Sequence, residues 1–548
     1  MSSLYWLRLT RTEAKDWSSR LFKKRTLYLS AALLTLPLVA NAAIAPSGTG
    51  SDLRPVLAQL TQHCSALPTS LDEQALHLLQ AFYAQRDGQP AWQSAEQRLQ
   101  LREQLAELAD DGLQPSDYVL PNPTTGQSAE QRDCAELLTS HSYLQALLHL
   151  RRGRLLQQRW EPLWHAPEHT AQDPQLATLS LALLHLHAPA AAFANARPAT
   201  VQYQQLRSAY AQQRLQPLSP WPTLTSGPLL KPGSQDARLP VLRARLLAQG
   251  YLAAEGEALG SAYDLATQTA LENFQRDHGL NPDGILGPAS LAELNISAQM
   301  RRDQLRANLE RLRWLADDMR NAAVMINIAA AELQVVRNNQ VLWRTRTQVG
   351  RAERQTPLLA SRIARLTLNP TWTVPPTILR DDKLPAIRED IGYLERHQMS
   401  VLDYDGNLLD PQSIDWERPG AILLRQSAGS HNPLGRVALR FANPFSVYLH
   451  DTPSQQLFSK APRAFSSGCV RIEAVDTLLA WLLSPGELEH VQTRIASGNT
   501  QQYRLQNPAP LLIAYWTVDA GLDGALRYYP DIYARDARLI QALAQPVP

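Results

Sequence analysis

The chain has 548 residues, and at roughly 100–200 residues per domain this length predicts three to five domains. Hydrophobic residues make up 44% and charged residues 19%, so the chain can bury real cores and is not disordered overall. Lys and Arg number 53 against 51 Asp and Glu, a net charge of +2, which excludes a polycationic nucleic-acid-binding protein. The composition also excludes histone-like, collagen-like and multi-spanning membrane proteins.

The first 42 residues have the pattern of an export signal. Residues 1–42 hold seven basic and two acidic residues. Lys23-Lys24-Arg25 precedes the apolar run Leu27–Ala40, and Ala40-Asn41-Ala42 follows as a small-x-small cleavage pattern. The run is shorter than the about 20 apolar residues of a spanning helix. We interpret residues 1–42 as a secretory signal, with an uncleaved membrane anchor as the alternative, and we expect export to an oxidising compartment.

Residues 51–215 have helical periodicity, with apolar side chains recurring at three and four residues. No catalytic constellation occurs there, so we expect a helical scaffold domain. Two of the three cysteines, Cys64 and Cys134, lie in this region, and Cys469 lies far from both. In an exported chain this arrangement predicts a Cys64–Cys134 disulfide and a free Cys469. The alternative is that all three are small core residues.

Residues 216–240 hold six prolines and two glycines, which is typical of a linker or an extended wrapping segment. Residues 241–296 then form a small helical unit, with one helix predicted over Leu265–His278. Its sequence Phe-Gln-Arg-Asp-His-Gly-Leu, ending at Leu280, is followed by the turn residues Gly284 and Gly287. This pattern resembles the three-helix peptidoglycan-binding module of bacterial wall enzymes, the alternative being a generic helical spacer.

After a predicted helix over Arg301–Met319 the apolar period changes to two, which indicates a mainly β domain over residues 321–540. We expect strands at 324–328, 333–336, 341–349, 363–368, 421–425, 436–440, 446–450 and 511–518. An insertion at residues 371–417 is Pro-rich at first and then helical around Leu384–Met399. A segment of this size beside a site is often a lid, so we expect it to cap the site and order the substrate.

The catalytic chemistry is concentrated in one stretch of this domain. Cys469 lies in the turn Ser466-Ser467-Gly468-Cys469, which we expect to open a helix over Val475–Leu483. A glycine turn directs backbone N–H groups to one point, as in an oxyanion hole, and a helix N-terminus favours a thiolate. A thiol of ordinary pKa is only a few per cent ionised at neutral pH, so it needs a base. His450, at the end of a predicted strand, is the nearest candidate.

These residues resemble the signature of the L,D-transpeptidase catalytic domain (YkuD type), a histidine followed by Ser/Thr-His-Gly-Cys-x-Arg. Four further segments fit the family: 349–351 with 355–357, 368–376, 432–436 and 448–453. The full order of segments, over residues 55–540, is similar to the long periplasmic YcbB-like type. Ser467 replaces the second histidine of many members, which leaves His450 as the sole base. The implied fold class is multidomain α+β: a helical N-terminal scaffold, a small three-helix peptidoglycan-binding domain, and a mainly β catalytic domain with a capping insertion.

The resemblance implies peptidoglycan cross-linking in the periplasm. The Cys469 thiolate would attack diaminopimelate in a tetrapeptide donor stem and expel D-alanine, with the oxyanion held at Gly468 and Cys469. His450 would protonate the leaving amine and then deprotonate the acceptor stem, giving a 3→3 cross-link. Arg471 would bind a stem carboxylate through its planar fork. The remaining site residues implied are Tyr448, Trp372 and Ser467, which would line the substrate site.

Several alternatives stay open at the level of sequence. A thiol L,D-carboxypeptidase or a wall-protein attachment enzyme would use the same acyl-enzyme, and a non-catalytic wall-binding scaffold would need neither His450 nor Cys469. A zinc site at His450, Asp451 and Cys469 lacks a fourth ligand at recognisable spacing. We therefore expect no metal or other cofactor. Expected partners are donor and acceptor stems, peptidoglycan synthases, and carbapenems as covalent inhibitors, with no nucleic acid.

Overall fold

The computed structural model describes residues 52–60, 64, 73–121, 126–167, 173–218, 220–253, 262–521 and 525–545. The segment interpreted as a secretory signal lies outside these ranges. Within them, no helix combines the length and the apolar character needed to cross a membrane.

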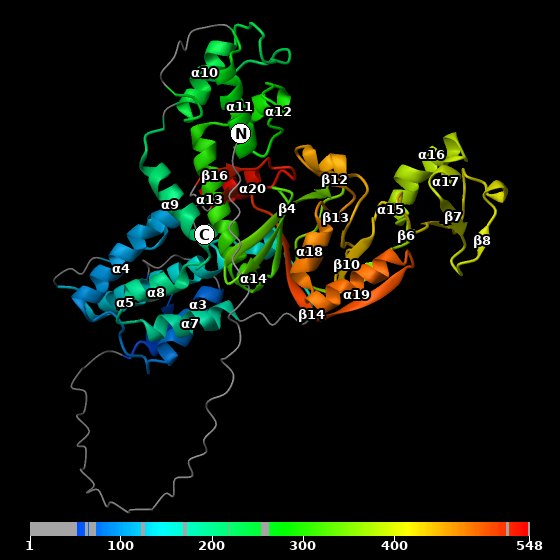
Figure 1. The fold of residues 1–548 in the computed structure, drawn as a ribbon. Helices are drawn as coiled ribbons and strands as arrows, with labels where there is room; N and C mark the ends of the chain where they lie inside the picture. The colour runs from blue at the N-terminus through cyan, green and yellow to red at the C-terminus, as the bar shows by residue number, and fades with distance from the viewer. Residues whose placement is uncertain are drawn as a thin grey trace, which may run out of the picture. The chain divides into compact units, whose positions relative to one another are not determined.

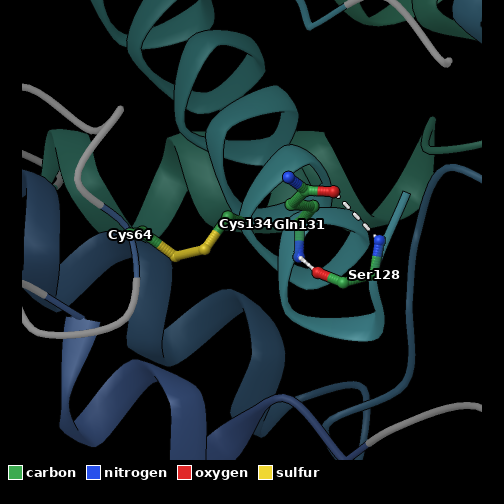
Figure 2. Close-up of a disulfide and its surroundings, with 4 residues drawn as sticks. All are labelled: Cys64, Ser128, Gln131 and Cys134. Carbon is green, nitrogen blue, oxygen red and sulfur yellow. Dashed lines mark hydrogen bonds between the residues drawn. A yellow bond between two sulfur atoms is a disulfide. The ribbon is translucent and has the colours of Figure 1, made fainter. Parts of the chain in front are cut away.

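The first part of the described chain is helical, because apolar side chains at helical spacing form one shared core. Its longest helix, α5, begins with a capping box in which Ser128 and Gln131 exchange side-chain and backbone hydrogen bonds (Figure 2). Cys64 and Cys134 form a disulfide beside this helix start, with 5.5 Å between their Cα atoms. The helices are α1 (Arg54–Ala58), α3 (Glu73–Ala84), α4 (Ala95–Glu107), α5 (Ala129–Arg152), α6 (Gln157–Trp160), α7 (Pro174–Leu184), α8 (Pro189–Ala196) and α9 (Val201–Leu215).

The Pro-rich segment wraps onto the small helical unit that follows it. Leu224 exchanges two hydrogen bonds with the side chain of Asn295, and Leu230 forms an isolated β-bridge with Leu286. The unit consists of α10 (Leu239–Ala248), α11 (Leu265–Asp277) and α12 (Pro288–Leu294), which share one apolar core. The wrapping interpretation of residues 216–240 therefore describes this segment better than a free linker.

The helix predicted over Arg301–Met319 is two helices, α13 (Ala298–Trp314) and α14 (Ala316–Asn321), separated at Leu315. The fully buried Arg311 of α13 is charge-paired with Asp536 at the start of the C-terminal helix α20 (Asp536–Ala544), with 2.5 Å between nitrogen and oxygen. A buried guanidinium needs such a partner because desolvating an unpaired charge is costly. This pair fixes α20 against α13.

The β-rich part of the chain is built on a ten-stranded sheet, ordered β1-β5-β10-β11-β13-β4-β3-β2-β14 with β12 paired to β4. Because β14 also pairs with β5, the order closes on itself like a barrel. The strands are β1 (Trp164–His165), β2 (Val324–Asn327), β3 (Glu332–Arg337), β4 (Gln340–Gly350), β5 (Leu359–Leu368), β10 (Val437–Phe441), β11 (Leu449–His450), β12 (Ala464–Ser466), β13 (Val470–Ile472) and β14 (Gln501–Ala514). Helices α18 (Val475–Leu482) and α19 (Pro485–Ala496) and the hairpin β15 (Val518–Ala520) and β16 (Leu526–Tyr528) complete it.

The insertion has its own small sheet, which the sequence analysis did not predict. Strands β6 (Trp372–Thr373), β9 (Leu423–Gln426), β7 (Met399–Leu402) and β8 (Leu408–Leu409) pair in that order. Short helices α15 (Pro376–Ile378), α16 (Leu384–Glu389) and α17 (Tyr393–Arg396) accompany them, in yellow in Figure 1. The strand expected at 421–425 thus belongs to the insertion, which extends past Glu417. The helix expected over Leu384–Met399 is broken, and Met399 begins a strand.

The multidomain α+β fold class is confirmed.

Candidate active site

The turn that carries Cys469 lies between two strands. Ser466 ends β12, Gly468 has φ +112°, and Val470 begins β13. Only glycine adopts this backbone conformation without strain, so Gly468 permits the turn. The expected helix begins only at Val475, after β13. The expectation that a helix N-terminus lies at Cys469 and favours its thiolate is therefore wrong.

Strand pairing brings the chemically active residues onto one face of the sheet. β11 and β13 are parallel neighbours, with Leu449 opposite Val470 and His450 opposite Arg471. Leu449 and Val470 point into the apolar core. Because side chains alternate along a strand, the flanking residues lie on the other face: Tyr448, His450, Cys469 and Arg471.

Cys469 is a free, half-buried thiol. Burial raises the pKa of this thiol, whereas hydrogen bonds from the backbone and hydroxyl of Tyr448 lower it. The positive charges of Arg440 and Arg471 also lower the pKa of Cys469. The thiolate is thus opposed by burial and supported by two guanidinium groups.

His450 is buried, with 3% of its surface exposed. Its Nδ1 lies 2.6 Å from the backbone oxygen of Asp451. Because a carbonyl oxygen only accepts, Nδ1 carries the proton and Nε2 holds the lone pair of a neutral imidazole. Burial lowers the pKa of His450 to about 3, and the charges of Arg471 and Arg440 act in the same direction.

In this structure His450 does not contact the Cys469 thiol through a hydrogen bond, although the sequence predicted that the two groups act as a pair. The strand register sets His450 beside Arg471, and the groups that shift the pKa of the Cys469 thiol are Tyr448, Arg440 and Arg471. Between His450 and Cys469, both within the described ranges, no hydrogen bond is formed. A substrate bound between them would have to bridge the two groups.

The backbone N–H groups expected to form an oxyanion hole are partly engaged. The Gly468 N–H donates to Ser466 Oγ at 3.2 Å, and this hydroxyl donates in turn to the Cys469 carbonyl at 2.5 Å. Ser466 therefore stabilises the turn, and the Gly468 N–H must change partner before it can bind an oxyanion.

A buried hydrogen-bond network, which the sequence analysis missed, holds the turn from behind. Thr356 Oγ1 accepts from the Gly350 N–H and donates to the Gly468 carbonyl, each at 2.9 Å. Tyr533 donates its hydroxyl to the Gly350 carbonyl at 2.7 Å and accepts from the Thr356 N–H at 2.9 Å. Gly350 and Thr356 lie in the segments that resembled the family, but nothing in their spacing indicated contact with Gly468.

Arg471 donates from Nη1 to Gln348 Oε1 at 3.0 Å, while its buried Nε has no hydrogen-bond partner. Burial lowers the pKa of its guanidinium, and the charge of Cys469 acts in the opposite direction. Arg471 is thus an incompletely satisfied cation on the same face as the thiol, as the expected role requires. Trp372 differs, because it packs against the apolar core of the insertion.

Ser467 links the turn to the insertion. Its exposed hydroxyl accepts from Arg354 Nη1 at 3.1 Å. The same guanidinium is paired with Asp382 at 2.8 Å and with Asp381 at 3.0 Å. Both aspartates belong to the helical segment Leu379–Lys383 of the insertion. One arginine therefore connects the residue two positions before Cys469 to the segment expected to cap the site.

A groove of about 740 Å³ begins where β11 and β13 end. Asp451 and Glu473, which follow these strands, line it together with Arg436 and Asp476. Asp451 Oδ2 accepts the Arg436 N–H at 2.9 Å. Across the described ranges, no three His, Cys, Asp or Glu side chains gather closely enough to hold a metal ion.

Comparison with protein-family models assigns three segments. Residues 77–209 match the "Scaffold domain" model, residues 235–294 match the "Putative peptidoglycan binding domain" model, and residues 321–496 match the YkuD model, the L,D-transpeptidase catalytic domain.

The chain is also similar to a curated protein and to two solved structures. A Haemophilus influenzae protein named "Putative L,D-transpeptidase" is 34% identical over 244 residues, covering 43% of this chain and 48% of that protein. The chain thus matches about half the length of this curated relative. The match to a crystal structure of an L,D-transpeptidase from Xylanimonas cellulosilytica covers 53% of this chain and 99% of that one, at 16% identity and a TM-score of 0.17. The match to a crystal structure of an L,D-transpeptidase from Stackebrandtia nassauensis covers 54% of this chain and 96% of that one, at 13% identity and a TM-score of 0.20. The matched segments thus place a region that resembles the YkuD-type L,D-transpeptidase catalytic domain, residues 321–496, in one chain with matches to a scaffold domain and a peptidoglycan-binding domain.

Proposed function

We propose that this protein forms 3→3 cross-links between peptidoglycan stem peptides through an acyl-enzyme on Cys469. The observation that carries the proposal is the free, half-buried Cys469 thiol on one sheet face with His450 and Arg471, inside the L,D-transpeptidase catalytic domain. A module that matches a peptidoglycan-binding family supports the same substrate class.

In the proposed first half-reaction the Cys469 thiolate attacks the carbonyl of diaminopimelate in a donor tetrapeptide. A thioester forms, the peptide bond to D-alanine breaks, and the leaving amine takes a proton from the base that received the thiol proton. The neutral His450, with its lone pair on Nε2, is suited to carry this proton. The incompletely satisfied Arg471 is suited to bind a stem carboxylate.

In the second half-reaction the side-chain amine of an acceptor diaminopimelate attacks the thioester and loses a proton to His450. The cross-link forms and the thiolate is released. The groove beyond His450 offers room for an incoming ammonium group, and Arg436, which also lines it, is paired with its carboxylates Asp451 and Asp476. We assign the acceptor to this groove.

The insertion is proposed to cap the site and order the donor. Its support is the chain of contacts from Ser467 through Arg354 to Asp381 and Asp382. A protein working on peptidoglycan is exported, and the Cys64–Cys134 disulfide fits the oxidising periplasm. Peptidoglycan synthases as partners and carbapenems as inhibitors belong to the same proposal.

The test incubates the purified full chain with disaccharide-tetrapeptide and follows both the products and the protein mass. We expect a 3→3 dimer and an acyl adduct with the wild type, and neither with Cys469→Ala. His450→Ala should lower acylation about 10²–10⁴-fold, the usual contribution of general acid–base catalysis. Formation of tripeptide without dimer would instead indicate a carboxypeptidase. Transfer of the stem to a protein lysine would indicate an attachment enzyme, and binding without any adduct would indicate a non-catalytic scaffold. An adduct that persists on Cys469→Ala would refute the assigned nucleophile.

A further inference from the structure

Arg440 lies at the active site, although the sequence analysis did not single it out. It is on β10, whose Ala438 and Leu439 pair with His450 and Leu449 of β11, so the next residue along β10 faces Tyr448. The Arg440 guanidinium carbon lies 3.9 Å from the centroid of the Tyr448 ring. A cation over an aromatic face at this distance is attracted to the negative face of the ring.

A second contact fixes the direction of Arg440. Its Nε donates to Thr367 Oγ1 on β5 at 3.3 Å. Thr367 is itself anchored by donating to Gln502 Oε1 at 3.2 Å. The guanidinium is therefore held between Thr367 on one side and the Tyr448 ring on the other.

Tyr448 connects this cation to the thiol: its backbone carbonyl accepts the N–H of Val470, the residue after Cys469, at 3.1 Å, and its hydroxyl and backbone lower the pKa of the Cys469 thiol. Burial raises the pKa of the phenol well above its ordinary value, so the hydroxyl keeps its proton and remains a donor. The groups that act on the Cys469 thiol are thus Tyr448, which directly precedes β11, Arg471 from β13 and Arg440 from β10. His450 is neutral, so the positive charge near the sulfur comes from the two arginines.

We propose that Arg440 is a positioning residue for the nucleophile: its guanidinium holds the Tyr448 ring against Cys469, and its charge stabilises the thiolate before any substrate binds. The role of the thiol in catalysis rests on the proposed function, whereas the effect on the thiol itself does not. A fixed cation supports a thiolate at every pH at which the enzyme works, since a guanidinium does not lose its proton.

The test measures the rate at which iodoacetamide alkylates Cys469 in the full chain as a function of pH. The other two cysteines are joined in the disulfide, so the signal comes from one thiol. Arg440→Gln should raise the midpoint of the pH profile by about half a unit to one unit, lowering the rate below the midpoint about threefold to tenfold, with the plateau at high pH unchanged.

Two companion variants separate charge from ring position. Arg440→Lys keeps the charge but lacks the planar group that stacks on the ring. The midpoint of its pH profile should therefore move by less than half of the shift in Arg440→Gln. Tyr448→Phe keeps the ring under Arg440 and removes the hydroxyl donor, so its midpoint should also rise. This variant keeps the proposal testable if Arg440→Gln fails to fold.

The matched control is Arg365→Gln. Arg365 is the exposed residue directly opposite Arg440 on β5, and the substitution removes one charge from the same sheet face. Its midpoint should move by less than a third of a unit. An unchanged midpoint in Arg440→Gln, or an equal shift in Arg365→Gln, would overturn the proposal. A shifted midpoint in an enzyme that makes no cross-links would leave this inference standing and overturn the proposed function instead.

Discussion

The hydrogen bonds of Thr356 give a prediction whose size can be worked out from the structure. Thr356→Val keeps the shape of the side chain but removes the hydroxyl that serves both the Gly350 N–H and the Gly468 carbonyl. Both glycines are buried, so each backbone group would lose its partner away from water. An unsatisfied buried group costs about 1–3 kcal/mol, which gives about 2–6 kcal/mol for the pair and about 2–4 kcal/mol if the turn partly relaxes.

This cost falls where the nucleophile is held. If the turn moves to recover a partner for Gly468, Cys469 leaves its place in a fraction of the molecules. At about 1.4 kcal/mol for each factor of ten, a local destabilisation of about 2–4 kcal/mol lowers acylation about 30-fold to 700-fold. Thr356→Ser keeps both hydrogen bonds and loses one methyl group, so it should cost about 1 kcal/mol and acylate near the wild-type rate.

The assay follows acylation of the full chain by a carbapenem with intact-protein mass spectrometry, alongside denaturant unfolding of the same samples. Thr356→Val should be acylated slowly and should have a lower free energy of unfolding than wild type. Thr356→Ser should be close to wild type in both the acylation rate and the free energy of unfolding. Wild-type acylation by Thr356→Val with unchanged stability would show that the network does not hold the turn.

Two further predictions concern the insertion and the buried histidine. Replacing both Asp381 and Asp382 by Asn should raise the KM for donor about threefold to tenfold through a loosened cap, while stability changes by less than about 1 kcal/mol because these pairs are partly exposed. The control Asp390→Asn breaks another ion pair of the insertion and should leave KM unchanged; equal KM in all three proteins would contradict the cap. For His450 the folded pKa of about 3 lies below the unfolded value of about 6.5, so the unfolded chain alone takes up a proton between these values. Its contribution to stability is complete above about pH 6.5 and is lost as the pH falls towards 3, by about 1.4 kcal/mol per pH unit. Subtracting the unfolding free energy of His450→Gln from that of wild type should isolate this slope, and a flat difference would mean that His450 titrates alike in both states.

The parts of the fold that were predictable are those in which a repeating pattern meets a single core. Period-two runs located β2, β3 and β4 to within a few residues, because alternate side chains of a strand must be buried. The helix over Leu265–His278 was similarly placed, since its core residues Leu271 and Phe274 recur at helical spacing. In both cases the apolar pattern of the local sequence is sufficient to predict which face is buried.

The insertion was harder to predict because its strands are short and pair over long sequence distances. Trp372 is paired with Gln426, and the two-residue strand at Trp372–Thr373 is too short to show any period. The prolines at the start of this segment also made β6 hard to predict, because proline is uncommon in strands. The same limitation explains why the contact of Trp372 with the apolar core of the insertion could not be predicted from the sequence.

The site was predictable as a set of residues but not as an arrangement. Cys469, His450 and Arg471 were identified, whereas the three-residue strand β13 between the nucleophile and α18 was not. That strand decides which groups meet, because its register sets His450 beside Arg471 and leaves Cys469 with Tyr448. No spacing rule in one chain reports the register of two strands nineteen residues apart.

The arrangement implies a division of work within the proposed reaction. Burial raises the pKa of Cys469 and makes His450 a weak base at rest, so the two groups alone would form little thiolate. The charges of Arg440 and Arg471 lower the pKa of Cys469 and so act against burial, which remains the larger effect. Once the thioester forms, the sulfur is neutral, and Arg471 has lost the anion beside it. A stem carboxylate can then take that place, so the proposed acylation would exchange one anion at Arg471 for another and hold the donor while the acceptor attacks.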